Sequence, residues 1–354
     1  MFKFIKIKKY YRILIVFVLI VSLLAASTTA IIKYDSRKAI TVSTNPTTDK
    51  KYIKWVQFDA SYSAMEKALS LDVKSHTKTV QLHWVELLAY LATKYGGNFS
   101  KYKSKDLDNL VTKLNKGETM EQLTTKMKNY NYYYEAYDAI LGGFVGEYDI
   151  QVKDPNNAEN IQWEKKYGLK VFSPIARGYS FSHYEDFGTG RSFGYARKHL
   201  GNDLMGSIGT PIMAVESGIV EVMGWNMYGG WRIGIRSFDQ KRYYYYAHLR
   251  KDRPFHCDLY EGKIVKAGDV IGYLGMTGYS TRENVNNITT PHLHFGMQII
   301  FDESQKEGIN ELWIDVYNIV NLLQKNRSAV VKDDETRNFY RVYDMIEPNS
   351  GYDF

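Results

Sequence analysis

The sequence predicts an α+β protein in which an N-terminal membrane helix, an all-α middle domain and a mainly antiparallel β-sheet domain follow one another. Three observations indicate this order. A long uncharged stretch lies near the N-terminus, apolar residues at helical spacing fill the middle, and short β-type runs separated by glycines begin at Phe172. The expected segments are a basic tip with a membrane anchor (1–32), a linker (33–54), a helical domain (55–170), a β-domain (171–328) and a C-terminal tail (329–354).

The leader has the pattern of a signal-anchor. Residues 1–12 carry five basic side chains and no acidic one, and residues 13–32 carry no charge. Twenty helical residues rise about 30 Å, which matches the apolar core of a bilayer. Basic flanks stay in the cytoplasm, so we expect a single-pass membrane protein whose later domains are extracytoplasmic. The alternative is a signal peptide that is cleaved among the small residues 25–30, which leads to secretion.

The overall charge argues against a nucleic-acid partner. The net charge is +7, but residues 1–38 hold eight basic residues and one acidic residue, so the remainder of the chain is neutral. Proteins that bind nucleic acids normally concentrate basic residues on a folded domain.

Cys257 is the single cysteine, which excludes an internal disulfide and a multi-cysteine zinc site. Any metal must therefore be held by histidines and carboxylates.

The middle domain is predicted to be helical. After the polar linker, apolar residues recur at helical spacing in five stretches: 55–73, 79–95, 106–114, 118–127 and 131–141. Glycine pairs follow the second and the last of them and are typical helix stops. We find no residue pattern here that predicts chemistry, and we expect a structural or substrate-presenting role.

The β-domain is predicted to hold an antiparallel sheet. Its candidate strands are 218–225, 231–237, 242–249, 270–274 and 293–300, with a closing helix at 315–324. No long helices separate the strands, which favours an antiparallel sheet over βαβ units.

Six of the eight histidines lie in this β-domain, and three local arrangements stand out. His199 and Asp203 are four residues apart with a glycine between them, and His248 ends a strand. His292 and His294 are two residues apart in a strand and so share one face. A hydrolytic zinc needs three protein ligands and an open position for water. Two histidines and an aspartate supply that set, which leaves other histidines free to move protons.

Together these arrangements resemble the motifs of the lysostaphin-type (LytM-like) zinc metallo-endopeptidases, bacterial enzymes that cleave peptidoglycan. The three motifs occupy 199–203, 246–249 and 292–294. Glycine-rich phrases at 209–220, 262–272 and 275–278 resemble the family as well. The resemblance covers about residues 175–320, in the expected order, and leaves out the helical domain.

The resemblance implies a role for each motif residue. It implies one Zn²⁺ per chain, held by His199, Asp203 and His294. It also implies that His248 and His292 flank the metal without binding it, orient or deprotonate the water, and stabilise the tetrahedral intermediate. This agrees with general chemistry, because zinc lowers the pKa of bound water to about 7 and histidine transfers protons near neutral pH.

Several features lie outside the family pattern. A polar insertion, Arg282–Thr290, precedes the last motif, and we expect it to border the cleft and influence substrate choice or entry. The glycine-containing segment 186–197 is expected to form a cleft wall, on which Tyr195 is a candidate substrate-binding residue. His183 and His256 match no motif, so we expect surface or structural positions for them.

The sequence therefore predicts a zinc endopeptidase that hydrolyses cross-links or stem peptides of peptidoglycan outside the cytoplasmic membrane. The alternative is a catalytically silent module of the same fold that scaffolds or regulates other cell-wall enzymes. All five expected metal and catalytic positions are present, which favours the enzyme. Oligoglycine bridges, D-alanyl cross-links and stem bonds all stay open as the cleaved bond.

Overall fold

The computed structural model describes residues 52–155, 157–306, 308–348 and 351. The predicted anchor and most of the predicted linker lie outside these residues, so both stay predictions. Within the described ranges, none of the helices combines the length and apolar character needed to cross a bilayer. Residues from Tyr52 onward cluster as one unit, in which the helical and β parts share a hydrophobic core.

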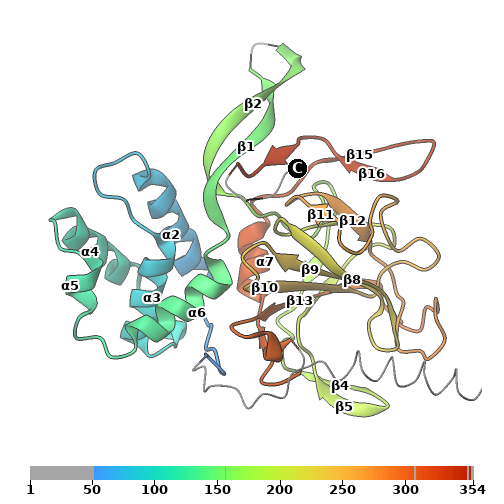
Figure 1. Cartoon of the computed structure of the whole chain (residues 1–354), viewed down its shortest axis with the longest axis horizontal. Helices are drawn as coiled ribbons and strands as arrows, with labels where there is room; N and C mark the ends of the chain where they lie inside the picture. The colour runs from blue at the N-terminus through green and yellow to red at the C-terminus, as the bar shows by residue number, and fades with distance from the viewer. Residues whose placement is uncertain (1–51, 156, 307, 349–350, 352–354) are drawn as a thin grey trace, which may run out of the picture. The chain divides into compact units, whose positions relative to one another are not determined.

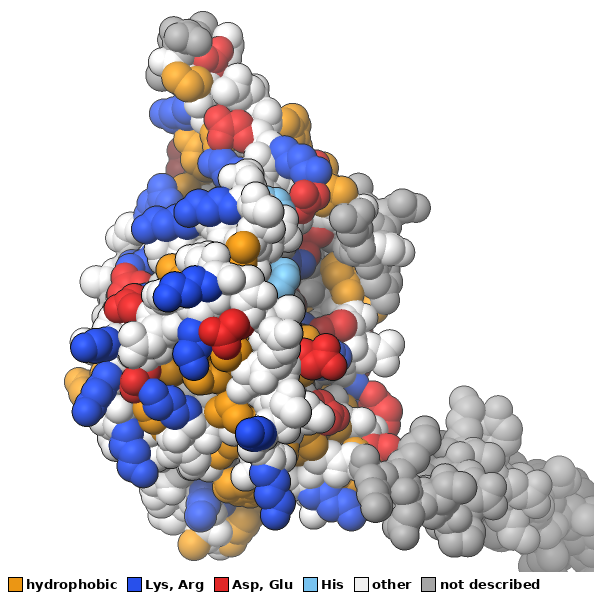
Figure 2. Space-filling view, turned by 90° about the vertical axis from the view of Figure 1, so that its left-hand side faces the viewer, with side chains coloured by type: hydrophobic (Ala, Val, Ile, Leu, Met, Phe, Trp, Pro, Cys, Tyr) orange, Lys and Arg blue, Asp and Glu red, His pale blue; other side chains and the backbone are white. Residues whose placement is uncertain are grey.

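The helical part confirms the predicted middle helices. Its elements are α2 (Tyr62–Ser75), α3 (Trp84–Tyr95), η1 (Phe99–Lys101), α4 (Ser104–Asn115), α5 (Met120–Thr124) and α6 (Tyr130–Leu141) (Figure 1). α2 begins later than predicted because the Ser61 side chain caps it by accepting a hydrogen bond from the Ala64 amide. Gly96 ends α3 in the left-handed conformation, with φ 63°. Figure 2, seen from the side where α4 and α5 lie, shows basic and acidic side chains together on this face.

The stretch after α6 corrects the prediction that residues 55–170 are all helical. β1 (Val145–Asp154) and β2 (Asn157–Leu169) form a long antiparallel hairpin. Apolar Tyr148, Ile150 and Val152 alternate with polar residues, a period-two pattern that the helical reading overlooked.

The predicted C-terminal tail carries strands as well. They are β15 (Val330–Lys332), β16 (Phe339–Arg341) and β17 (Met345–Ile346). β15 pairs with β16, and β17 pairs with β1, so that Met345 lies opposite Ile150. Glu347, which is buried, accepts a hydrogen bond from Ser217 Oγ at 2.5 Å. The tail is thus part of the folded unit.

The β part is built on an antiparallel sheet, as predicted. The sheet has eight strands, in the order β11-β8-β9-β10-β13-β6-β3 with β14 paired to β13. Its strands are β3 (Ser182–His183), β6 (Asn202–Met205), β8 (Gly218–Asn226), β9 (Gly230–Ser237), β10 (Arg242–Ala247), β11 (Ile264–Val265), β13 (His292–Ile299) and β14 (Leu312–Ile314). Outside it lie the pairs β4 (Gly190–Phe193) with β5 (Tyr195–Lys198) and β7 (Pro211–Met213) with β12 (Val270–Tyr273). The short η2 (Glu303–Gln305) and the closing helix α7 (Tyr317–Leu323) complete the part.

A buried arginine, paired with a glutamate, joins the central sheet to the helical part. Arg242, at the start of β10, donates to Glu216 Oε2 at 2.7 Å and to the carbonyl oxygen of Ala139 in α6 at 2.7 Å. Tyr244 donates to the same Glu216 oxygen at 2.6 Å. Arg242 is 1% exposed, so its charge depends on these partners. The contact fixes α6 against the strand that ends beside His248.

Candidate metal and catalytic site

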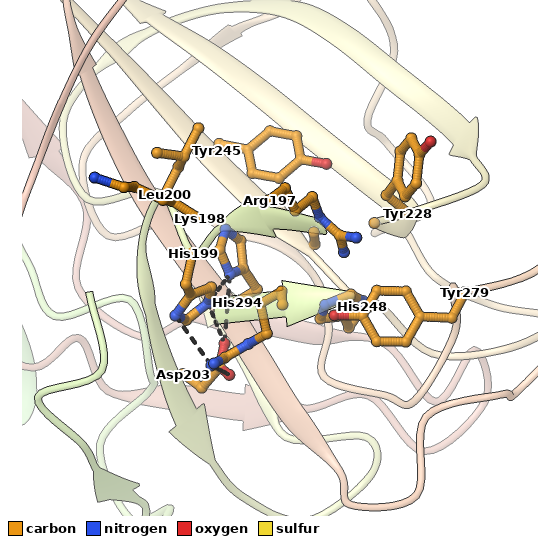
Figure 3. Close-up of a pocket in the computed structure, with 13 residues that line it drawn as sticks. Arg197, Lys198, His199, Leu200, Asp203, Tyr228, Tyr245, His248, Tyr279 and His294 are labelled. Carbon is orange, nitrogen blue, oxygen red and sulfur yellow. Dashed lines mark hydrogen bonds and ion pairs between the residues drawn. The ribbon is translucent and has the colours of Figure 1, made fainter. Parts of the chain in front are cut away.

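Two neighbouring strands and a tight turn bring the three predicted ligands together. Asp203 on β6 lies opposite His294 on β13 in the strand register. His199 Nε2 lies 3.0 Å from Asp203 Oδ1 and 2.7 Å from His294 Nδ1 (Figure 3). Gly201 makes the approach possible, because a Cβ there would lie 2.5 Å from the Phe295 carbonyl oxygen and 2.9 Å from the His294 ring.

This donor set fits a divalent cation such as zinc. Two imidazole nitrogens and a carboxylate oxygen lie within 4.8 Å of one another. Burial alone raises the pKa of Asp203, but hydrogen bonds from His199 and His294 hold this pKa well below its usual range. Asp203 is therefore ionised, as a metal ligand must be. Three protein ligands next to a pocket leave room for water and substrate.

The carboxylate of Asp186 and the guanidinium of Arg191 contact the predicted ligands. Sequence reasoning did not single out either residue. His199 Nδ1 lies 3.1 Å from the Asp186 backbone oxygen and 3.3 Å from its Oδ2. Arg191 Nη2 bridges Asp186 Oδ2 at 2.7 Å and Asp203 Oδ2 at 3.1 Å. Burial lowers the pKa of His199, but the bonds to Asp186 and Asp203 outweigh it and raise this pKa to about 9. Such outer partners orient metal ligands.

The other two predicted histidines share one hydrogen-bonding pattern. His248 Nδ1 lies 2.9 Å from the carbonyl oxygen of Thr277, and His292 Nδ1 lies 2.8 Å from that of Thr290. A carbonyl oxygen only accepts, so each Nδ1 carries a hydrogen, and in the neutral form of the ring each Nε2 is the acceptor. The two rings are 4.8 Å apart, and His292 Nε2 lies 3.6 Å from Asp203 Oδ1. Both rings thus lie beside the metal-binding group.

His248 is held neutral and in a strained conformation. Burial, followed by the neighbouring His292 and His294, lowers the pKa of His248 well below its usual value. Its backbone adopts φ 62°, a left-handed conformation that costs a bulky residue about 1–3 kcal/mol. A hydrogen bond from its amide to the Gly229 carbonyl oxygen, at 2.7 Å, holds it there.

The site opens into a pocket of about 140 Å³. Its lining includes the three predicted ligands and His248. Most of the lining residues that sequence reasoning did not single out are aromatic or basic: Arg191, Arg197, Lys198, Tyr228, Tyr245 and Tyr279. Tyr195 lies beside the pocket, 57% exposed, with its ring 5.6 Å from that of Tyr228. The segment 186–197 contributes to the wall through β4 and β5.

A second group of potential ligands was not predicted. His256, Cys257 and Asp258 also bring ligating atoms within 4.8 Å of one another. Cys257 and Asp258 are exposed, and the Cys257 sulfur lies 3.5 Å from the Tyr340 hydroxyl. His256 is buried and His183 partly buried, with its ring 4.5 Å from that of Tyr317.

Comparison with known proteins identifies the domain that carries the site. The model of peptidase family M23 matches residues 197–309, which include all five predicted metal and catalytic residues. Residues 197–309 form an M23 domain. This M23 domain is homologous to L-Ala–D-Glu endopeptidase of Bacillus subtilis, with 40% identity over 35% of this chain and 36% of the relative. Lysostaphin of Staphylococcus simulans is 41% identical over 27% of this chain and 17% of its own length.

The chain thus spans little more than a third of the first of these relatives and less than a fifth of the second. Among solved structures, a putative glycyl-glycine endopeptidase of Ruminococcus gnavus is 21% identical. The similarity covers 80% of this chain and 94% of that one, with a TM-score of 0.49. The family match and the two curated relatives confirm the resemblance of the sequence motifs for the M23 domain.

Proposed function

We propose that this chain is a zinc-dependent endopeptidase that hydrolyses peptide bonds of peptidoglycan outside the cytoplasmic membrane. One observation carries the proposal: the group of His199, Asp203 and His294 lies beside two histidines whose Nε2 atoms are left as acceptors. The names of the relatives, an L-Ala–D-Glu endopeptidase and lysostaphin, support the substrate. The location rests on the basic, then uncharged, leader, with secretion after cleavage as the alternative.

The ligands and the flanking histidines have separate tasks in this proposal. His199, Asp203 and His294 hold one zinc, which supplies a Lewis acid for the scissile carbonyl and acidifies water. His248 and His292 orient the attacking water through Nε2, accept its proton and return it to the leaving amine. Once protonated, either ring donates a hydrogen bond to the oxyanion that develops on the carbonyl.

Residues around the pocket position these groups. Asp186 accepts from His199 Nδ1, which directs His199 Nε2 toward the metal. Tyr195 is exposed on the rim of the pocket. There it is proposed to contact a substrate residue next to the cleaved bond.

The test is product analysis on intact peptidoglycan. The full-length chain, purified in detergent and loaded with zinc, is incubated with sacculi, and the products are read by mass spectrometry. We expect new peptide termini, and none from His292→Ala that still binds zinc. The zinc-loaded protein is compared with another hydrolase that digests the same sacculi. If only the other hydrolase releases products, the catalytically silent scaffold becomes the better hypothesis.

A further inference from the structure

Among the residues that the structure describes, one guanidinium in the pocket has no acidic partner. Arg197 on β5 lines the pocket together with His199 and His294. Its Cζ lies 4.7 Å from the centroid of the Tyr228 ring and 5.1 Å from that of Tyr279. Figure 3 shows the guanidinium between these two rings. Two aromatic faces therefore hold the cation in place by cation–π attraction.

The hydrogen bonding of Arg197 is incomplete. Its Nη1 is buried and has no hydrogen-bond partner. Within the described part of the chain Arg197 makes no ion pair, whereas Arg191, also in the pocket wall, pairs with Asp186 and Asp203. A buried N–H donor of a charged group without an acceptor is unfavourable, and aromatic faces offer it no lone pair along the N–H direction. An oxygen atom of a ligand in the pocket would complete the hydrogen bonding of Arg197.

The insertion Arg282–Thr290 helps to build the slot formed by Arg197 and the rings of Tyr228 and Tyr279. The Asn287 side chain donates to the Tyr279 carbonyl oxygen at 2.6 Å, and the Ser280 amide donates to the Met227 carbonyl oxygen at 3.0 Å. The first bond holds the insertion against the loop that carries Tyr279, and the second ties this loop to the one that carries Tyr228. Phe193 stacks on the Tyr279 ring at 5.4 Å and adds to the wall. An apolar wall that limits water strengthens the attraction between the guanidinium and an anion.

We propose that Arg197 binds a carboxylate of the peptide that is cleaved, so that the enzyme selects acidic stem peptides over uncharged oligoglycine bridges. This inference rests on the proposed function of the same site. Guanidinium and carboxylate match as a planar, two-bond pair. Arg197 lines the same pocket as His199 and His294, so we expect the carboxylate on a residue adjoining the cleaved bond. Stem peptides carry such free carboxylates on γ-linked D-glutamate, whereas glycine bridges have none.

The test compares two synthetic stem peptides that differ only at this carboxylate, one free and one amidated, with pentaglycine as a third substrate. We expect kcat/KM of the zinc-loaded enzyme to be about 10- to 100-fold higher for the free acid than for the amide, as one charge-assisted pair predicts. Arg197→Gln should bring this ratio close to one. Arg197→Lys, which keeps the charge without the planar pair, should fall between the two.

Lys251→Gln is the matched control, since it removes one exposed positive charge on a loop outside the pocket. Lys251→Gln should leave the acid-to-amide ratio of kcat/KM unchanged. If it lowered this ratio as much as Arg197→Gln does, the preference would come from the overall positive charge and not from Arg197. Zinc content and melting temperature of each variant confirm that it is folded.

Binding separates this inference from the proposed function. The affinity of each peptide is measured on His292→Ala, with and without Arg197→Gln. Tighter binding of the free acid that is lost with Arg197→Gln supports the slot even if sacculi are not cleaved. Equal binding and equal cleavage of acid and amide overturn the inference while leaving the endopeptidase intact.

Discussion

His199 directs its two ring nitrogens toward two different aspartates. Its Nε2 lies 3.0 Å from Asp203 Oδ1, and its Nδ1 lies 3.3 Å from Asp186 Oδ2. One ring therefore connects a predicted metal ligand with a carboxylate that the motif does not include. This arrangement orients an imidazole for metal binding, because the outer carboxylate fixes which nitrogen keeps its hydrogen.

Removal of that outer carboxylate should weaken zinc binding. We expect Asp186→Ala to lower zinc affinity by about 10- to 100-fold, because His199 loses a partner at Nδ1 and Arg191 loses an acceptor. Competition with a chromogenic chelator measures the change. Glu185→Ala, which removes the exposed neighbouring carboxylate, is the control. Equal zinc affinity in the two variants would show that Asp186 has no part in the site.

Substitutions at the ligands and at the flanking histidines should separate metal binding from catalysis. His294→Ala and Asp203→Asn should lose both zinc and activity, since each removes one of three ligating atoms. His292→Ala should retain zinc and lose activity by at least about 100-fold, as expected for a general acid–base residue. Elemental analysis and product release measure the two properties. A His292→Ala protein without zinc would contradict the division of roles.

His183 should destabilise the fold in mild acid. Burial lowers its pKa from 6.5 to about 4. Between these two values the unfolded chain binds a proton that the folded chain does not, so stability falls as the pH falls through this window. His183→Phe keeps a ring against Tyr317 and removes the titration.

The variant should therefore retain about 2 kcal/mol more of its pH 7 stability at pH 4.5 than the wild type does, allowing for partial exposure of His183. Urea denaturation at the two pH values gives the comparison. Identical losses in both proteins would mean that His183 titrates as it does in the unfolded chain.

Loss of the buried arginine should destabilise the whole unit. Arg242→Ala leaves Glu216 buried without its cation, which costs about 3–5 kcal/mol. The matched control is Lys241→Ala. Its partner, Asp138 in α6, lies 2.7 Å away, but Lys241 is 44% exposed, so we expect a loss of at most about 1 kcal/mol. Chemical denaturation measures both. Similar losses would show that the buried pair contributes no more than an exposed one.

Residue spacing alone predicted only those parts of the site that lie close together along the chain, and the family resemblance was needed to combine all five residues into one site. Spacing alone indicated that His292 and His294 share a face of a strand, and both reach Asp203 in the structure. Asp186 and Arg197 were not singled out, because their partners lie on other segments and no short spacing connects them.

The fold, like the site, was predictable where the pattern is local in the sequence. The central strands were found within a residue or two at most ends, since their apolar runs are bounded by turns. The hairpin β1–β2 was missed because its strands follow directly on a helix and carry many polar residues. The short strand β17 owes its state to pairing with β1, which is distant in sequence. Neither the pairing of β17 with β1 nor the burial of Glu347 can be predicted from the neighbouring residues in the sequence.

The pairing of β17 with β1 also has a consequence for biosynthesis. Chains emerge from the ribosome N-terminus first, and folding begins before synthesis ends. β1 can pair with β2 early, but its other edge stays open until Met345 and Ile346 have been made. An open strand edge invites pairing with another chain. In nascent or truncated copies that lack β17, Asp149 and Ile150 therefore present an unpaired stretch of strand edge, which β17 pairs with in the folded unit.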